Sequence, residues 1–471
     1  MLLAAVSALW SSACTGPRGP SRPPILLLTV DTLRADHLGE YGYDRQTSPG
    51  LARLAADGVV FEHAFTTAPK TSPAYASMFT GHYPYRHGLQ SLGQELADQN
   101  ETLAERLSAG GYRTAGFVSS TVMIDRLSGL GQGFAHWDDR MTSREANRDN
   151  YERVASQTTA SVLEWLPQDL AGVFVFVHLI DPHGPYTPPS LFLVRLRRGR
   201  GPLLKPGQVP EFQRLEGATA VGDYIDAYDA EVLYATGQLS RILDELDERG
   251  VYDDSLIIVT ADHGESFGED GYFFRHGKTL HEASTRVPLI IKPPGGRADV
   301  VEPRWIDSVS LVDIAPTVLD YAGVDGPAQP HGSSLRPVLE GRAEAVERLV
   351  FSQRRTAGGD HRGVHGKRGS LYVGECGARD EGCVDTYLAR REDGSVLELD
   401  AATETRAALR AALDAFAAEA EAYKVPFEVT HRYRPGNKDF VRQFVEDHNT
   451  RLEQLDARDV EALERLGYLE R

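Results

Sequence analysis

Three apolar runs in the chain are followed by residues that can bind a metal ion or transfer a proton. They are ILLLTV (25–30) before Asp31, VFVFVH (173–178) before Asp181 and His183, and SLIIVT (255–260) before Asp262 and His263. Near-continuous apolar runs are typical of strands buried on both faces of a sheet. Ligands of such sheets bind beyond the carboxyl ends of the strands. One of these side chains could simply cap a helix, but three sets at one edge predict a functional site.

These strand-end residues suit a metal ion together with a nucleophile. Asp31, Asp262 and His263 offer two carboxylates and an imidazole, a mixed set that favours Zn²⁺ or Mn²⁺, with Ca²⁺ as the alternative. Thr71 lies in APKTSPAYASMFTGHYPYRHG (68–88) and is a poor nucleophile in water. A metal ion could hold its hydroxyl as an alkoxide, as it lowers the pKa of bound water. Taken alone, Asp262 and His263 also fit a strand-ending turn.

The elements that must position these residues indicate an α/β fold. Two further apolar runs, TAGFV (114–118) and VPLII (287–291), predict strands. Residues 223–249 carry an apolar stripe at helical spacing that stops at Gly250. This alternation predicts a doubly wound, mostly parallel sheet with helices on both faces. From about residue 350 the pattern becomes that of an antiparallel sheet followed by a helix-rich segment.

The predicted organisation has four parts. They are an export or lipoprotein-type signal and tether (1–23), a catalytic domain (24–348), a smaller C-terminal α+β subdomain (349–430) and a C-terminal tail (431–471). Residues 1–10 are apolar but too few to span a bilayer. The Ser-Ala before Cys14 is similar to the end of a bacterial lipoprotein signal. We therefore expect export to the periplasm or a lipid anchor on Cys14 at the bacterial envelope, the alternative being an unstructured apolar N-terminus.

Charge and cysteine content narrow the class of protein. The net charge of −18 would repel a phosphate backbone, so no nucleic-acid partner is expected. Cys376 and Cys383 fit a disulfide that closes a small hairpin in an oxidising compartment, unless they are two unrelated thiols. The basic run RLRRGRG (195–201) could bind an anionic polymer, although a solvated loop is the simpler interpretation.

The chain resembles the sulfatases of the alkaline phosphatase superfamily from about residue 24 to its last residues. The similar segments, in family order, are ILLLTVDTLRADHLGEYGY, TSPAYASMFTGHYPYRHG, GYRTAGFV, VHLIDPHGPYTPP, YDAEVLYATGQL, VTADHGESFGE, HGKTLHEASTRVPLI, VDIAPTVLDYAG and LERLGYLE. Each motif alone is weak, whereas their shared order is specific. The resemblance implies an N-terminal α/β domain that holds a metal ion, a smaller C-terminal domain, and cleavage of sulfate or phosphate esters through a covalent intermediate.

The resemblance also implies roles for individual residues. Carried over by motif, the metal ligands are Asp31, Thr71, Asp262 and His263, while Thr71 as nucleophile, His183, Lys278 and, less directly, His276 surround the substrate. His183 matches a histidine that contacts substrate, and Lys278 resembles the lysine that binds the transferred group.

The departures from the family pattern bear on the mechanism. Typical members carry Cys-x-Pro-x-Arg, whose Cys or Ser is oxidised to formylglycine, but this chain has TSPAY (71–75). No formylglycine is therefore expected, and Thr71 must attack directly. The paired Asp-Asp of the family is Asp31-Thr32 here, and a Gly-Lys pair is replaced by a pair ending in Ser119.

Threonine chemistry slightly favours phosphate esters. A formylglycine hydrate releases sulfate by elimination, whereas a threonine ester must be displaced by water or another acceptor, which is easier at phosphorus than at sulfur. We predict a metal-dependent hydrolase acting on a sulfated or phosphorylated small molecule, glycan or lipid. The alternatives are an envelope phosphotransferase of the phosphoethanolamine-transferase type and an inactive anion-binding protein. The inactive protein is an alternative because a site without the Arg and Lys would hold an anionic substrate less well.

Overall fold

The computed structural model describes residues 22–141, 143–144, 151–198, 201–295, 303–327, 330–344, 347–356, 359–374, 386–390, 396–398 and 403–423. The predictions on Cys14, on Cys376 and Cys383, and on the tail at 431–471 lie outside these residues. No helix within the described ranges is both long enough and apolar enough to cross a membrane.

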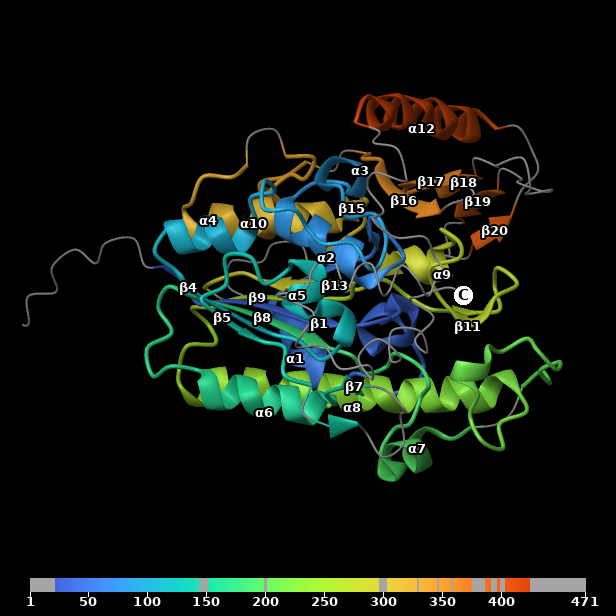
Figure 1. Cartoon of the computed structure of the whole chain (residues 1–471), viewed down its shortest axis with the longest axis horizontal. Helices are drawn as coiled ribbons and strands as arrows, with labels where there is room; N and C mark the ends of the chain where they lie inside the picture. The colour runs from blue at the N-terminus through green and yellow to red at the C-terminus, as the bar shows by residue number, and fades with distance from the viewer. Residues whose placement is uncertain are drawn as a thin grey trace, which may run out of the picture.

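An eight-stranded sheet of order β14–β2–β13–β9–β1–β8–β4–β5 forms the centre of the fold (Figure 1). Its strands are β1 (Ile25–Val30), β2 (Val59–Phe61), β4 (Arg113–Phe117), β5 (His136–Asp138), β8 (Val173–Leu179), β9 (Leu256–Thr260), β13 (Leu289–Lys292) and β14 (Arg304–Trp305). The five strands from β9 to β5 are parallel to one another. Every residue of β1 and β8 is buried, which explains why both read as continuous apolar runs. The predicted doubly wound, mostly parallel sheet is confirmed.

Strand β13 is the exception to the parallel order. It is antiparallel to both β9 and β2. The connection from β9 to β13 does not require a crossover helix, because the chain only has to reverse its direction to form an antiparallel neighbour. The predicted run at 287–291 is also divided: β12 (Arg286–Val287) pairs with β3 (Ala64–Phe65), and β13 starts after Pro288. Proline has no N–H to give to a ladder, so it separates the two strands.

Helices cover both faces of the sheet (Figure 1). On one face lie α1 (Ala52–Asp57), α6 (Ala155–Trp165) and the long α8 (Val221–Glu248), and on the other α2 (Thr71–Thr80), α4 (Leu103–Ala109) and α10 (Ile314–Ala322). Helix α8 confirms the helix predicted at 223–249. The remaining short elements of this part are α3 (Pro84–His87), α5 (Asp125–Ser128), β6 (Ser143–Arg144), β7 (Tyr151–Glu152), α7 (Ser190–Leu196), β10 (Ser266–Phe267), β11 (Phe273–Arg275), α9 (Glu282–Thr285), β15 (Val309–Ser310) and α11 (Arg336–Leu339).

A five-stranded antiparallel sheet and one helix follow the catalytic part, as the sequence predicted. They are β16 (Val350–Thr356), β17 (Gly359–Gly366), β18 (Gly369–Gly374), β19 (Thr386–Arg390), β20 (Val396–Glu398) and α12 (Glu404–Ala422). This sheet contacts the segment that leads into α2. The N–H of Gln353 donates to the carbonyl of Thr67 at 2.8 Å, and the hydroxyl of Ser352 donates to the carbonyl of Thr66 at 2.5 Å. The C-terminal sheet thus helps to place the start of α2.

Candidate active site

Asp31, Asp262 and His263 meet where the adjacent strands β1 and β9 end. Each offers one ligand atom, and these atoms all lie within 4.8 Å of one another. All three side chains are fully buried. The structure therefore brings together the three residues that the sequence singles out as ligands of a divalent ion.

The donor atoms of this cluster face inward. Oδ1 of Asp262 accepts from the backbone N–H groups of Thr32, at 3.3 Å, and His263, at 2.9 Å. Oδ2 of Asp262 and Oδ1 of Asp31 accept no hydrogen bond from any residue that the structure describes. The Nδ1–H of His263 donates to the carbonyl of Gly264 at 3.0 Å, which turns Nε2 toward Oδ2 of Asp262 at 3.2 Å. Buried carboxylate oxygens without a donor fit a cation, and the O/N donor set fits Zn²⁺ or Mn²⁺.

Burial and the nearby charge of Asp262 raise the pKa of Asp31 well above its ordinary value. Its second oxygen is oriented by His178 at the end of β8. The N–H of Ser119 donates to Nδ1 of His178 at 3.3 Å, so the proton of this imidazole is on Nε2, 3.3 Å from Oδ2 of Asp31. Burial lowers the pKa of His178 to about 4, which keeps the ring neutral. A neutral imidazole that donates to a metal-binding carboxylate fixes its orientation.

Thr71 is the first residue of helix α2 and is fully buried. Its Oγ1 lies 3.4 Å from Nε2 of His263, beside the carboxylate cluster. The N-terminus of a helix of this length carries partial positive charge and backbone N–H groups, which favour an anion or a developing negative charge. The predicted nucleophile and the predicted ligands therefore share one site.

Three histidines form a row that leads away from the cluster. The ring centroids of His263 and His276 are 4.4 Å apart, and those of His276 and His183 are 5.1 Å apart. Nδ1 of His276 lies 3.3 Å from a carboxylate oxygen of the buried Glu265. Lys278 is half-buried and lies two residues beyond His276, in the same turn. The structure thus places His276 beside His263 and His183 beside His276, and Lys278 follows His276 by two residues along the chain.

The loop after β1 is held in a strained conformation by helix α8. Thr32 has a φ of +53°, which is rare for a β-branched residue. The hydroxyl of Tyr228 donates to the carbonyl of Thr32 at 2.8 Å and accepts from the N–H of Arg34 at 2.9 Å. The same strained turn directs the N–H of Thr32 toward Asp262. The strain therefore orients a metal-ligand candidate.

Arg34 connects the two loops that carry the candidate metal ligands. Its guanidinium donates to the carbonyl of Glu265 at 2.9 Å and pairs with Asp36 at 2.7 Å and Glu269 at 2.6 Å. Because Arg34 follows Asp31 and Glu265 follows His263, this residue fixes the spacing between the loop after β1 and the loop after β9.

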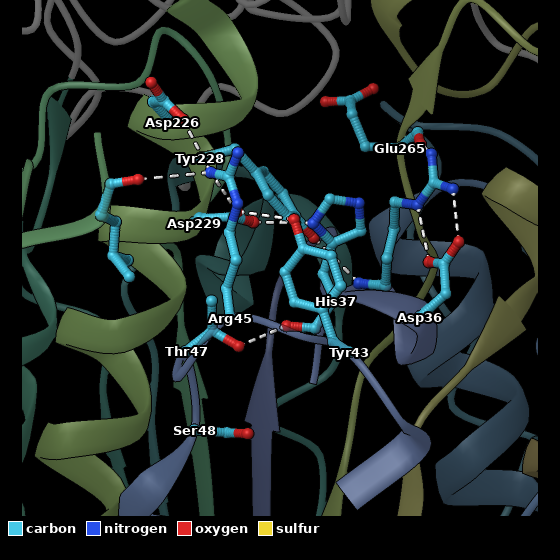
Figure 2. A network of polar contacts seen from close by, with 12 residues as sticks. Asp36, His37, Tyr43, Arg45, Thr47, Ser48, Asp226, Tyr228, Asp229 and Glu265 are labelled. Carbon is cyan, nitrogen blue, oxygen red and sulfur yellow. Dashed lines mark hydrogen bonds and ion pairs between the residues drawn. The ribbon is translucent and has the colours of Figure 1, made fainter. Parts of the chain in front are cut away.

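Figure 2 shows a polar network that joins the segment after β1 to α8, in which three side chains of that segment converge on two aspartates of the helix. Asp229 accepts from Tyr43 at 2.7 Å, from Arg45 at 2.9 Å and lies 2.7 Å from Nδ1 of His37, while Asp226 accepts from Arg45 at 2.7 Å. Buried charges that are paired and hydrogen-bonded in this way hold a loop rigidly against its support.

Sequence reasoning did not assign roles to three of these residues. His178 is the last residue of the apolar run at 173–178, and Glu265 follows His263 by two positions, so both had a positional signal. Tyr228 lies in the segment 223–249, where it belongs to the predicted apolar stripe and has no separate signal. Its polar role depends on a contact with Thr32, which is far away in the sequence.

Comparison with known proteins agrees with this geometry. The sulfatase family profile matches residues 23–324. The chain belongs to the sulfatase family. Its resemblance to this family is thereby confirmed, and the chain is a hydrolase of sulfate or phosphate esters.

Individual relatives cover most of the chain. An arylsulfatase of Clostridium perfringens is 25% identical over an alignment of 382 positions, which covers 68% of this chain and 79% of that protein. The multifunctional alkaline phosphatase superfamily protein PehA of Trinickia caryophylli is 26% identical over an alignment of 402 positions, which covers 68% of this chain and 77% of that protein. The fold is similar to the phosphonate monoester hydrolase of Agrobacterium radiobacter, with a TM-score of 0.69, 20% identity, and coverage of 85% of this chain and 96% of that one.

Proposed function

We propose that this sulfatase-family hydrolase uses Thr71 as its nucleophile and that phosphate esters are its better substrates. The observation that supports the proposal is the meeting of Oγ1 of Thr71, two carboxylate oxygens without a donor among the described residues, and a row of three histidines at one edge of the sheet. The substrate class is a phosphorylated or sulfated small molecule, glycan or lipid.

Asp31, Asp262, His263 and Thr71 would hold one divalent ion, with Zn²⁺ or Mn²⁺ preferred by the donor set. When bound, such an ion lowers the pKa of a hydroxyl beside it and offsets the charge of an anionic ester. His178 holds Asp31 in place, and the backbone N–H groups at Asp262 leave its other oxygen for the cation.

The remaining steps are carried by the side chains of the chain itself. Oγ1 of Thr71, deprotonated with its proton released to solvent, attacks phosphorus or sulfur, and the bond to the leaving oxygen breaks as the new ester forms. His276 donates a proton to that oxygen from Nε2, because its Nδ1 faces the Glu265 carboxylate. Water then attacks the same atom and displaces Oγ1 of Thr71 as the alkoxide, while neutral His276 accepts the proton of the water, so both groups return to the states in which they began.

The preference for phosphate esters rests on the threonine. Its ester has no second hydroxyl from which to eliminate the group, so water must attack the central atom, and phosphorus accepts this attack more readily than sulfur. The similarity to PehA, described as multifunctional, and to a phosphonate monoester hydrolase agrees with phosphoester chemistry, whereas the arylsulfatase relative keeps sulfate esters among the candidates.

The test is a paired assay with Zn²⁺, Mn²⁺ or Ca²⁺ on aryl phosphate monoester, aryl phosphate diester and aryl sulfate. Thr71→Ala should reduce turnover by at least about 10³-fold, as loss of a nucleophile does, and leave the metal content unchanged within a few-fold. Thr80→Ala, at the buried far end of the same helix, is the matched control and should keep turnover. Mass spectrometry of quenched reactions should find the transferred group on Thr71. Full activity of Thr71→Ala would exclude it as the nucleophile.

We also propose, from the N-terminal sequence, that the protein is exported and either periplasmic or anchored by a lipid on Cys14. Fractionation of bacterial cells that express the full chain should recover it outside the cytoplasm, and recovery in the cytoplasm alone would contradict export.

A further inference from the structure

The chain lacks two basic residues that the family pattern provides, and the structure shows what their positions do instead. Tyr75 stands where the pattern has Arg, and its buried hydroxyl donates to Oγ1 of Thr29 at 2.8 Å. Ser119 stands where the pattern has Lys, and its buried hydroxyl donates to the carbonyl of His178 at 2.7 Å. Neither side chain can supply a positive charge to an anionic substrate.

Lys70 is a basic residue that borders the same site from another direction. It directly precedes Thr71 and is the N-cap residue of α2. Its aliphatic chain crosses Gly277: a Cβ built on this glycine, which has a φ of +73°, would lie 3.3 Å from Cε and 3.4 Å from Cγ of Lys70. Gly277 lies between His276 and Lys278, so Lys70 reaches the turn that carries both predicted substrate contacts.

A lysine at this position is unfavourable for the helix itself. An ammonium group can only donate hydrogen bonds, so it cannot cap the backbone N–H groups at the start of α2. Its charge also opposes the positive end of the helix dipole. Residues that break a local rule in this way are expected at functional sites, and an anion held between Lys70 and the helix start would offset both costs.

We propose that Lys70 is a specificity residue that binds the transferred group and favours doubly charged phosphate monoesters over singly charged diesters and sulfate esters. This inference rests on the proposed function, because it concerns the same site. The ammonium groups of Lys70 and Lys278 would flank the substrate beside the His276 ring, and a second positive charge is worth most to a substrate with a second negative charge.

The experiment compares Lys70→Met with wild type on the three aryl substrates. We expect kcat/KM to fall roughly tenfold to a hundredfold for the phosphate monoester, the range for loss of a charge-assisted hydrogen bond, and less than about threefold for the diester and the sulfate. Lys70→Arg should restore most of the monoester activity. Lys205→Met, a change at an exposed lysine outside the site, is the matched control. Equal losses on all three substrates would overturn the specificity role.

A binding measurement separates this proposal from the proposed function. Titration of inorganic phosphate into the Mn²⁺-loaded protein should give an affinity that falls roughly tenfold or more in Lys70→Met and is unchanged in Lys205→Met. If wild type turns over none of the esters, the proposed function fails while the phosphate titration still decides the role of Lys70. Equal phosphate affinity of Lys70→Met and wild type, or no phosphate binding by wild type, would overturn the inference.

Discussion

Replacing Asp31 with Asn should stabilise the protein without metal and destabilise it, relative to wild type, with metal. In the metal-free protein Oδ1 of Asp31 and Oδ2 of Asp262 are buried without a donor among the described residues, and the two carboxylates repel each other. An amide at position 31 removes one charge and gives Asp262 an N–H donor. A buried unsatisfied polar group costs about 1–3 kcal/mol, so the free energy of unfolding should rise by about that amount.

Metal should reverse this order. A ligand that binds only the folded protein adds about 2.7 kcal/mol at a concentration 100 times its dissociation constant. Wild type should gain this stabilisation from Mn²⁺ or Zn²⁺, whereas Asp31→Asn, with one carboxylate ligand fewer, should gain much less. The two proteins should therefore exchange places in thermal stability between EDTA and saturating metal.

The assay is thermal unfolding of both proteins in EDTA and across a metal titration. The matched control is Asp313→Asn, because Asp313 is an equally buried aspartate whose two oxygens accept from Arg348 at 2.7 and 2.8 Å. This variant should be less stable than wild type in both conditions. A lower melting temperature of Asp31→Asn in EDTA would refute the account of an unsatisfied carboxylate, and equal stabilisation of wild type and Asp31→Asn by metal would show that Asp31 is not a ligand.

Two further predictions concern stability away from the Asp31, Asp262 and His263 cluster. Burial lowers the pKa of His87 to about 3. The free energy of unfolding is therefore highest above the unfolded pKa of about 6.5 and falls as the pH is lowered, by about 2 kcal/mol at pH 5. His87→Asn should show a smaller fall in melting temperature between pH 7 and pH 5 than wild type, and an equal fall would contradict this account. Arg45→Met leaves the buried Asp226 and Asp229 without their guanidinium and should cost about 3 kcal/mol in denaturant unfolding. A change below about 0.5 kcal/mol would mean that the remaining partners of the two aspartates satisfy them without Arg45.

The sequence was sufficient to locate the strands that carry the site. The runs at 25–30, 173–178 and 255–260 match β1, β8 and β9 closely. Strands buried on both faces must be apolar along their whole length, so they are visible without any structural information. The residues just beyond them share one edge because the strands are parallel, which is why Asp31, Asp262 and His263 could be grouped in advance.

The direction of β13 could not be read in the same way. A short buried strand has the same apolar composition whether it runs parallel or antiparallel to its neighbour, and the structure decides for antiparallel pairing with β9. The division of the run at Pro288 had a local signal, since proline interrupts a ladder, but the separate partners of β12 and β13 had none.

The amino-acid types and their order along the chain determined the fold class and indicated the candidate metal ligands and the candidate nucleophile, because each depends on local pattern or on position after a strand. Only the tertiary structure decided which groups act on them: His178 on Asp31, Tyr228 on Thr32, and Lys70 across Gly277. The physical reason is that these contacts join segments far apart in sequence, whose distances depend on the packing of helices and sheet. Hydrogen bonds and charge effects act over a few ångströms, so their partners are fixed only once that packing is complete.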